Sequence, residues 1–358
     1  MIRIERIPHP GDTDAAPHPW LVGLSAVDHT VSREQYGNDD FSDDVAARQG
    51  RLRGSAYAHQ DAWVALEGGR VVAYAWCHRP LREDRDVGNI ELAVLPEARR
   101  RGLGDALMTT LTEFLSADGR GTLMGFTFSP AGAEGPDALA ARSGTGAVDP
   151  RLPGNAFAVH HGFTLEQVER PSTLTLSAET LQRADALGRA AASVAGPDYE
   201  LVGWVGPCPD DLVDGLADLA SRMITDVPMA AELNDVQVWD ADRLRSAEAR
   251  NVEIGTAWVT VAARHMPSGT LAAYTEIEWP LHHPVGTWQG DTLVRADHRG
   301  RRLGMLMKAA NLRRLLDANP AAERVHTWNA AENSHMLAIN DALGFVPTGL
   351  EGTWRRRG

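Results

Sequence analysis

The sequence has little cysteine, no long apolar run and fewer basic than acidic residues. Its two cysteines, Cys77 and Cys208, belong to no Cys-x-x-Cys pair, which argues against a disulfide framework or a cysteine zinc site and fits a reducing cytoplasm. No stretch of eighteen apolar residues offers a membrane span, and the N-terminus lacks a signal-peptide apolar core. The formal net charge of -13 disfavours nonspecific binding to nucleic acid. We therefore expect a cytoplasmic protein with no nucleic-acid or membrane partner, whose acidic surface can steer a cationic small molecule.

Two stretches of the sequence are alike although they lie 200 positions apart. "ARRRGLGDAL" begins at Ala98, and "HRGRRLGMLM" begins at His298. The offset of 200 aligns six pairs of residues in and just before these stretches. They are Glu91 with Asp291, Val94 with Val294, Arg99 with Arg299, Arg101 with Arg301, Leu103 with Leu303 and Gly104 with Gly304. Later, "HGFTL" around Gly162 and "LGFVP" around Gly344 align at an offset of 182. Matches in one order with a single change of spacing predict a diverged internal duplication.

Each copy has the pattern of a mixed α/β sheet. The strands expected in the first copy are residues 62–66, 71–77, 89–95 and 122–128. Those expected in the second copy are residues 256–264, 270–279, 290–294 and 324–328. Helices are expected to begin at Leu103, where leucines recur every four residues, and at Leu303. The fold class predicted is α/β with two similar domains in tandem, at residues 1–170 and 199–358.

Two segments outside these copies have a distinct composition. Residues 171–198 are Ala-rich before Gly196 and Pro197, and we read them as a helical connector. Residues 130–154 are small, polar and rich in Gly and Pro, which predicts a surface loop without regular structure that we expect to border a substrate entrance.

The arginine-glycine loop between a buried strand and a helix suits a phosphate. A helix start leaves N–H groups without partners, its dipole favours negative charge, and glycine allows a close approach to the backbone. The loop is neither a Walker nor a Rossmann loop, because no Gly-Lys-Ser/Thr follows and position 107 is Leu. In the second copy Arg302 replaces the middle glycine, and we expect it to keep a negative φ there.

These residues resemble the acetyl-CoA signature of the GNAT N-acetyltransferases, Arg/Gln-x-x-Gly-x-Gly/Ala after the fourth strand. Arg99, Gly102 and Gly104 match all three positions, while the second copy keeps Arg299 and Gly304. "TWNAAENSHMLAINDALGF", from Thr327, resembles a later motif of the family, with Asn333 at the start of a helix that ends in Gly-Phe. The resemblance covers nearly the whole chain, as a tandem bacterial GNAT protein.

The resemblance implies transfer of an acyl group from acetyl-CoA, or another acyl-CoA, to an amine. The pantetheine arm of the CoA would lie along the fourth strand near Val94 or Val294. A backbone N–H near Leu95 or Arg295 would hold the oxyanion that develops on the thioester carbonyl. The residues expected to bind the co-substrate are Val94, Leu95, Arg99, Arg100, Arg101, Gly102, Leu103, Gly104, Asp105, Val294, Arg295, Arg299, Gly300, Arg301, Arg302, Leu303, Gly304 and Asn333. No metal is implied.

An amine acceptor needs a base, because a lysine-like amine with a pKa of ~10.4 is about one-thousandth neutral at pH 7. The candidates are Glu91 and Asp291 on the fourth strands, and Glu276 on the neighbouring strand of the second copy. Glu278, Gln289 and Asn329 are the expected acceptor contacts. The plain alternative for each carboxylate is a solvated residue or an ion-pair partner. Trp-rich stretches of the second copy either line an amine pocket or pack in the core.

The family's usual acid is a tyrosine four residues before the terminal glycine, where this chain has Ala158 and Asn340. Tyr274, His298 and His335 are possible substitutes. The second copy has more polar strand residues, and we expect it to perform acyl transfer to a small antibiotic or metabolite amine in a ternary complex, as a monomer or homodimer. The alternatives are a CoA-binding sensor or scaffold without turnover, and a protein-lysine acetyltransferase.

Overall fold

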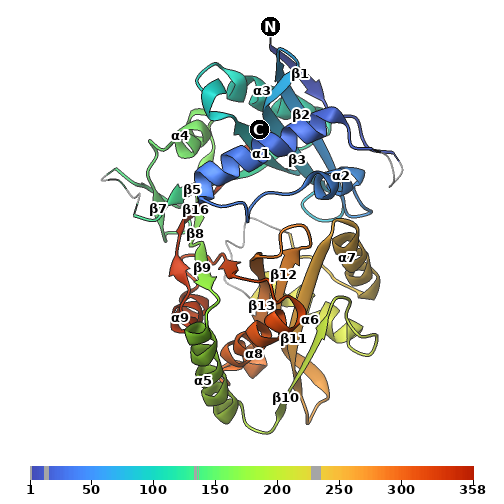
Figure 1. Ribbon diagram of the computed structural model, residues 1–358, viewed down its shortest axis with the longest axis vertical. Helices are drawn as coiled ribbons and strands as arrows, with labels where there is room; N and C mark the ends of the chain where they lie inside the picture. Colours follow the sequence, from blue (N-terminus) through green and yellow to red (C-terminus); the bar gives the residue numbers. More distant parts are fainter. Residues whose placement is uncertain (1, 12–15, 133–134, 136, 227–234) are drawn as a thin grey trace. The chain divides into compact units, whose positions relative to one another are not determined.

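A computed structural model describes residues 2–11, 16–132, 135, 137–226 and 235–358. The chain forms two compact units, each with its own sheet. Unit 1 consists of Met1–Val168 with Leu350–Gly358, and unit 2 consists of Glu169–Gly349 (Figure 1). Within the described residues, no helix is both long enough and apolar enough to cross a membrane.

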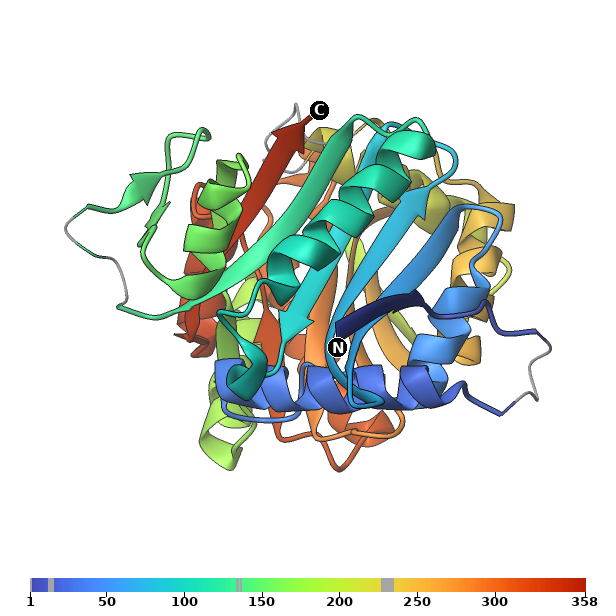
Figure 2. The same cartoon turned by 90° about the horizontal axis from the view of Figure 1, so that it is seen from above.

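Unit 1 contains a seven-stranded sheet whose strands run in the order β1-β2-β3-β4-β5-β16-β8. The strands are β1 (Ile2–Arg6), β2 (Ala58–Glu67), β3 (Arg70–Pro80), β4 (Val87–Val94), β5 (Thr122–Pro130), β8 (Thr164–Glu169) and β16 (Gly349–Arg357). Its helices are α1 (Pro19–Tyr36), α2 (Val45–Arg53), α3 (Leu103–Ala117) and α4 (Pro153–His160). Helices α1 and α3 lie on opposite faces of the sheet (Figure 2). The leucines predicted to recur along α3, at positions 103, 107, 111 and 115, are all buried, as the pattern predicts.

Unit 2 repeats this arrangement in the order β10-β11-β12-β13-β14-β9-β15. The strands are β9 (Ser172–Thr175), β10 (Tyr199–Val205), β11 (Thr256–His265), β12 (Thr270–Pro280), β13 (Gly286–Val294), β14 (Arg324–Thr327) and β15 (Val346–Pro347). The helices are α5 (Ala178–Ala195), α6 (Val213–Asp226), α7 (Ala241–Glu253), α8 (Leu303–Ala318) and α9 (Ser334–Leu343). The mixed α/β class predicted from the sequence is confirmed.

The duplication extends to the pairing register. Ala73 pairs with Val94 in unit 1, and Ala273 pairs with Val294 in unit 2, so both pairs keep the offset of 200. The offset of 182 also has a structural counterpart: a Cβ on Gly104 would lie 2.9 Å from Phe157, and one on Gly304 would lie 3.2 Å from Ile339. Each glycine therefore lets the helix after the loop approach the next helix closely.

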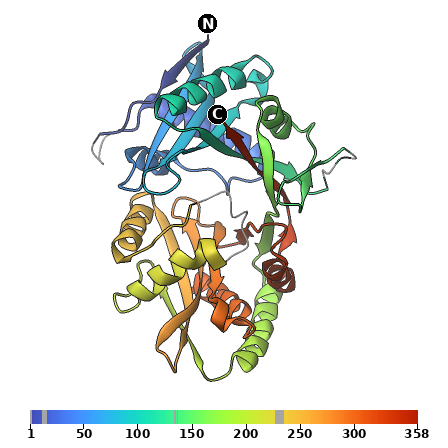
Figure 3. The same ribbon diagram turned by 180° about the vertical axis from the view of Figure 1, so that it is seen from behind.

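The two units exchange one strand each. Strand β9 follows β8 directly in the sequence but lies in the sheet of unit 2, between β14 and β15. Strand β16 follows β15 but lies in the sheet of unit 1, between β5 and β8 (Figure 3). The units therefore differ from the predicted division at residues 1–170, 171–198 and 199–358. The expected connector contains β9 and the predicted helix α5, both within unit 2, and the C-terminal strand belongs to unit 1.

The segment predicted as an irregular loop, residues 130–154, is partly ordered. It contains β6 (Leu139–Ala140) and β7 (Ala147–Val148), which pair with each other in antiparallel fashion. Ala141 and Val148 are buried in the core of unit 1, and this burial orders a stretch whose composition alone favoured a loop. Residues 133, 134 and 136 of this segment lie outside the described residues.

Candidate active site

The two arginine-glycine loops share a backbone path. Each has two residues in the left-handed region, Arg100 (φ 60°) and Gly102 (φ 77°) in unit 1, Gly300 (φ 79°) and Arg302 (φ 55°) in unit 2. The expectation that Arg302 keeps a negative φ is therefore wrong. Each loop places one glycine and one arginine at the same two left-handed positions, in opposite order, and so retains the turn at the start of the following helix.

The fourth and fifth strands of each unit separate beyond a short paired segment. Strand β4 pairs with β5 over Val87–Asn89, and β13 pairs with β14 over Gly286–Trp288. Both fourth strands continue to residue 94 or 294, immediately before the loop. This leaves a length of strand edge beside the helix start, which is where the resemblance places the pantetheine arm.

The backbone amides predicted to hold an oxyanion are already engaged. The amide of Leu95 donates to the Val72 carbonyl at 3.0 Å, and the amide of Arg295 donates to the Ala272 carbonyl at 3.0 Å. Because successive amides of a strand point to opposite edges, those of Val94 and Val294 point toward the separated edge. These amides are the better candidates for polarising a carbonyl.

The loop arginines of unit 1 are bound by carboxylates. Arg99 pairs with Glu34, at 2.9 Å for its Nη1, and Arg101 pairs with Glu67. In both units the Nε of the first loop arginine donates to the carbonyl that ends the strand, Arg99 to Val94 at 3.1 Å and Arg299 to Val294 at 3.2 Å. The first arginine therefore fixes the loop against the strand edge.

Two more of the predicted co-substrate residues have clear structural roles. Asn333 caps α9, because its side chain accepts from the Met336 amide at 3.2 Å, and the helix ends at Gly344 as predicted. Asp105 accepts from His161 Nε2 at 3.0 Å. The ligand atoms of Asp105, His160 and His161 lie within 4.8 Å of one another, at the surface of unit 1.

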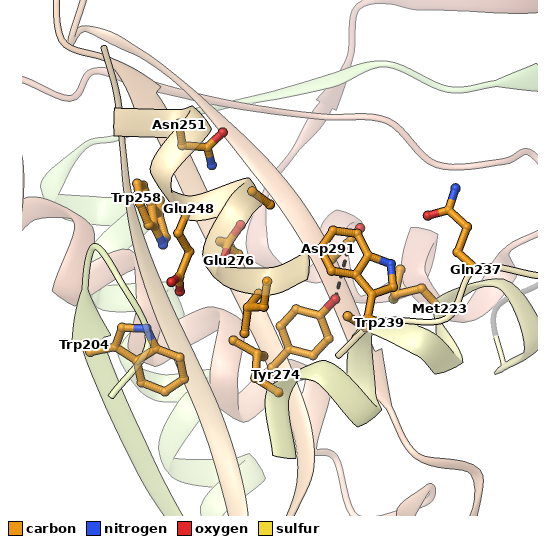
Figure 4. A pocket seen from close by; sticks show the side chains of 14 residues that line it. Trp204, Met223, Gln237, Trp239, Glu248, Asn251, Trp258, Tyr274, Glu276 and Asp291 are labelled. Carbon is orange, nitrogen blue, oxygen red and sulfur yellow. Dashed lines mark hydrogen bonds between the residues drawn. The ribbon is translucent and has the colours of Figure 1, made fainter. Parts of the chain in front are cut away.

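Unit 2 contains a pocket of about 250 Å³ between α6, α7 and the sheet face (Figure 4). Three carboxylates line it, Glu248 from α7, Glu276 from β12 and Asp291 from β13. Four aromatic side chains also line it, which are Trp204, Trp239, Trp258 and Tyr274. We call this the unit 2 pocket.

A β-bulge presents two of these carboxylates to each other. In β12 and β13, Thr275 pairs with Thr292 and Ile277 pairs with Gln289, so two residues of β13 oppose Glu276. The matching strands of unit 1 pair without a bulge over this region. Extra residues of this kind re-aim side chains and are frequent beside active sites.

Packing around the two carboxyl groups disfavours their ionised forms, although Glu276 as a whole residue is half-buried and Asp291 is exposed. Burial and the neighbouring Glu278 and Asp291 raise the pKa of Glu276 to about 8, although Thr260 donates to it at 3.1 Å. Burial also raises the pKa of Asp291, which accepts from the Tyr274 hydroxyl at 2.9 Å. Burial and Asp291 in turn raise the pKa of Tyr274, so this phenol keeps its proton.

The structure brings Asp291 and Glu276 into one pocket but places two of the expected acceptor contacts elsewhere. Gln289 points to the opposite face of the sheet. There its amide nitrogen, Nε2, donates to Thr275 Oγ1 at 3.0 Å and to the Glu276 carbonyl at 2.6 Å. It closes the bulge. Asn329 accepts a hydrogen bond from the Asn340 side chain at 2.5 Å. Asn340, which stands where the family usually has its tyrosine, therefore holds Asn329 in place. Glu278 lies near enough to Glu276 to raise its pKa.

Only one of the three candidate acids lies in the unit 2 pocket. Tyr274 lines the pocket, whereas His298 Nδ1 lies 2.9 Å from the Tyr199 hydroxyl and His335 is exposed in the first turn of α9. In unit 1, Ala158 is buried in the core. Tyr274 is therefore the candidate that the geometry favours.

Glu91, the third predicted base, is part of an ion-pair cluster in unit 1. Arg48 on α2 reaches Glu91 at 3.1 Å and Asp28 at 2.9 Å, and the Tyr74 hydroxyl lies within hydrogen-bond distance of both carboxylates and donates its one hydrogen to either. Burial alone would lower the pKa of Arg48, but Glu91 and Asp28 outweigh this effect and raise it. Both carboxylate oxygens of Glu91 are therefore already occupied by hydrogen bonds from Arg48, and Tyr74 also contacts one of them.

Sequence reasoning missed Glu248, Arg48 and the tryptophans Trp204 and Trp239 on the elements that cover the sheet. Positions 48 and 248 are themselves 200 apart. Extending the offset upstream of the strands would have paired them and shown the reversed charge. The two tryptophans have no equally simple signal, since a tryptophan in an amphipathic segment is as typical of a core.

Comparison with known proteins agrees with this architecture. Residues 26–129 match the acetyltransferase (GNAT) family. The chain is similar to a tandem GNAT protein from the clavulanic acid biosynthesis pathway, solved without acetyl-CoA, with 27% identity, a TM-score of 0.75 and coverage of 99% of this chain and 98% of that one. It shares its fold with a GCN5-related N-acetyltransferase from Sphaerobacter thermophilus, with 13% identity, a TM-score of 0.59 and coverage of 99% and 95%. No curated protein matches the sequence.

Proposed function

We propose that this chain is a tandem acetyltransferase of the GNAT family, because residues 26–129 match that family and the chain is similar to a tandem GNAT protein over its length. In this proposal, unit 2 transfers the acyl group of an acyl-CoA to the amine of a small molecule. The observation that carries the proposal is the unit 2 pocket, which is lined by Glu276 on β12 and by Asp291 on the part of β13 that no longer pairs with β14. GNAT enzymes generally use acetyl-CoA, and direct transfer needs both substrates bound at once.

The residues around the loop of unit 2 fit an acyl-CoA. The diphosphate would lie against Arg299–Gly304, where the first amides of α8 have no partner within the helix and two left-handed residues open the turn. The pantetheine would follow β13 near Val294. When bound, the thioester supplies an activated acyl group and a thiolate leaving group.

Glu276 is the base in this proposal. An ammonium with a pKa of ~10.4 must lose its proton before it attacks, at a cost of about 4–5 kcal/mol at pH 7. A carboxylate whose pKa is about 8 is a stronger base than an ordinary one, provided that it is ionised. Asp291 orients Tyr274 through their hydrogen bond, and Tyr274 can donate a proton at its hydroxyl.

Unit 1 is not proposed to carry out transfer. The matching acid, Glu91, pairs with Arg48. The residue 200 positions after Arg48 is Glu248, which lines the unit 2 pocket. The carboxylates gathered in the unit 2 pocket also favour an enzyme over a CoA-binding scaffold, because clustered acids repel one another and do not aid binding of the anionic CoA. A pocket of about 250 Å³ favours a small acceptor.

Thiol release from acetyl-CoA across a panel of small amines tests the proposal. The two cysteines of the chain are buried, so a thiol reagent reports released CoA. We expect an amine-dependent rate that falls by about 10²–10⁴ in Glu276→Gln. Glu91→Gln is the matched variant in unit 1 and should change the rate by less than about threefold. The proposal fails if no amine raises the rate above background hydrolysis, or if Glu91→Gln loses as much activity as Glu276→Gln.

A further inference from the structure

Positions 48 and 248 carry opposite charges in otherwise matching surroundings. Arg48 lies on α2 and Glu248 on α7, and both helices pack on the same face of their sheets as the fourth-strand acid. The tyrosine and the acid are kept in both units, as Tyr74 with Glu91 and as Tyr274 with Asp291. A reversed charge within a conserved frame indicates that the two sites hold different occupants.

In unit 1 the occupant is part of the chain. The Arg48 guanidinium lies 2.9 Å from Asp28 and 3.1 Å from Glu91, and only 6% of the side chain is exposed. Its central carbon lies 5.1 Å from the ring centre of Trp76 and 5.8 Å from that of Tyr74. Asp43 also lies 3.5 Å from the Nε of Arg48. Unit 1 therefore contains a cation enclosed by three carboxylates and two aromatic rings.

Unit 2 has carboxylates and aromatic rings of the same kind around a cavity. Among the described residues, neither Glu276 nor Asp291 pairs with a lysine, arginine or histidine. Glu248 pairs with Arg245 at 2.6 Å, and this arginine also reaches Asp210 outside the pocket. Glu276 is half-buried and Asp291 is exposed. Neither carboxylate has a counter-charge in the described part of the chain, and a bound cation would supply one.

A second observation also points to a ligand. Among the residues that the structure describes, the indole nitrogen of Trp204 has no hydrogen-bond partner, and the residue is only 8% exposed. Figure 4 shows this nitrogen turned into the pocket, on the side where Glu248 lies. A buried N–H donor is normally satisfied, so it calls for an acceptor atom on the molecule that the pocket holds.

We propose that the unit 2 pocket binds a small aliphatic ammonium ion that also carries an oxygen acceptor, with its cation held between Glu276, Asp291 and the aromatic rings and its oxygen facing Trp204. This inference rests on the proposed function in taking that molecule as the acyl acceptor. The chemistry of recognition is the one that unit 1 displays with Arg48. The volume of about 250 Å³ lies just below the ~300–1,000 Å³ of pockets for drug-sized ligands, which suits a compact amine.

Three probes of nearly equal size test the two parts of the proposal, with binding followed by tryptophan fluorescence. These are 3-methoxypropylammonium, the neutral 3-methoxypropan-1-ol and n-pentylammonium, which lacks the oxygen. We expect the first to bind at least about tenfold more tightly than the alcohol, and about three- to tenfold more tightly than pentylammonium. The second preference should disappear in Trp204→Phe. The proposal is overturned if the alcohol binds as tightly as the ammonium ion.

A charge reversal provides an independent variant. Glu248→Arg places a guanidinium in unit 2 at the position that Arg48 has in unit 1, and we expect ammonium binding to be lost. Glu248→Gln adds no positive charge and should weaken ammonium binding less. Circular dichroism of both variants checks that unit 2 remains folded, and the Trp204→Phe comparison remains decisive if it does not. Retention of ammonium binding by a folded Glu248→Arg protein would refute the proposal.

The outcomes separate this inference from the proposed function. If the ammonium probes bind selectively but none is acetylated in the presence of acetyl-CoA, the proposed function fails and the cation site stands. If amines are acetylated without any preference for charge or oxygen in binding, the function stands and the cation site is refuted.

Discussion

Glu276 should make the protein less stable as the pH rises, and Glu276→Gln should remove this dependence. The carboxyl group is buried and its pKa is about 8 in the folded protein, against an ordinary value of 4.5. Between these two values the folded state holds a proton that the unfolded state has released. Stability is therefore fully present below pH 4.5, falls through the interval, and reaches its minimum above pH 8.

The magnitude follows from the width of that interval. Each pH unit within it corresponds to about 1.36 kcal/mol, so the two units from pH 5 to pH 7 correspond to about 2.7 kcal/mol. We expect the free energy of unfolding of unit 2 to fall by that much more in the wild-type protein than in Glu276→Gln. Asp291, whose pKa is also raised, remains in both proteins, so its contribution largely cancels.

Hydrogen exchange of the amides of β12 and β13 at pH 5 and pH 7, corrected for intrinsic rates, reports the stability of unit 2. Glu323→Gln is a suitable control, because this glutamate pairs with Arg324 at the surface. The control should follow the wild-type slope within about 0.5 kcal/mol. Equal slopes for the wild-type protein and Glu276→Gln would mean that Glu276 is ionised throughout, which would remove the argument for its role as a base.

Three other results are expected. With one amine, the rate of the wild-type protein divided by that of Glu276→Gln should rise about tenfold from pH 7 to pH 9. The reason is that the ionised fraction of a group with a pKa of about 8 rises from about one-eleventh to ten-elevenths over this interval. A ratio that stays constant with pH would contradict this. In urea titrations, Arg302→Gly should raise the free energy of unfolding by about 0.5–1 kcal/mol, because the φ of Arg302 is 55°. Gly300→Arg should lower the free energy of unfolding, and a change of the same sign in both variants would argue against backbone strain. Removal of residues 350–358 should abolish the calorimetric transition of unit 1, because it takes β16 and the buried Trp354 out of that sheet, and an unchanged transition would refute the exchange of strands.

The sequence predicts those parts of the fold that are local and periodic. The strands and helices that flank each loop were all expected, because alternation in strands and the leucine spacing of α3 are set by neighbouring residues. Helices α1, α2, α6 and α7 were not expected, because they lie outside the two aligned stretches, although the apolar faces of α6 and α7 are at least as regular as that of α3. The destination of β9 and β16 could not be derived, because hydrophobic pattern identifies a strand but not the sheet that it joins.

The candidate site was predicted in part for the same reason. Asp291 and Glu276 were identified as candidates by residue type and position, and the structure brings both to one pocket. Gln289 was expected beside them, but the bulge in β13 turns its side chain to the other face, and a bulge of one residue leaves little trace in a sequence. Glu248 comes from an element distant in sequence, so only the tertiary structure shows that it lines the same pocket.

The position of β16 has a consequence for synthesis of the protein. The ribosome completes residues 1–168 long before it makes residues 350–358, and at about 5–20 residues per second the interval is roughly 10–40 s. Throughout that time the nascent N-terminal half exposes two strands, β5 and β8, that lack the neighbour lying between them in the finished sheet. Protease treatment of ribosome-bound chains stalled at residue 340 would show whether that half is digested until translation ends.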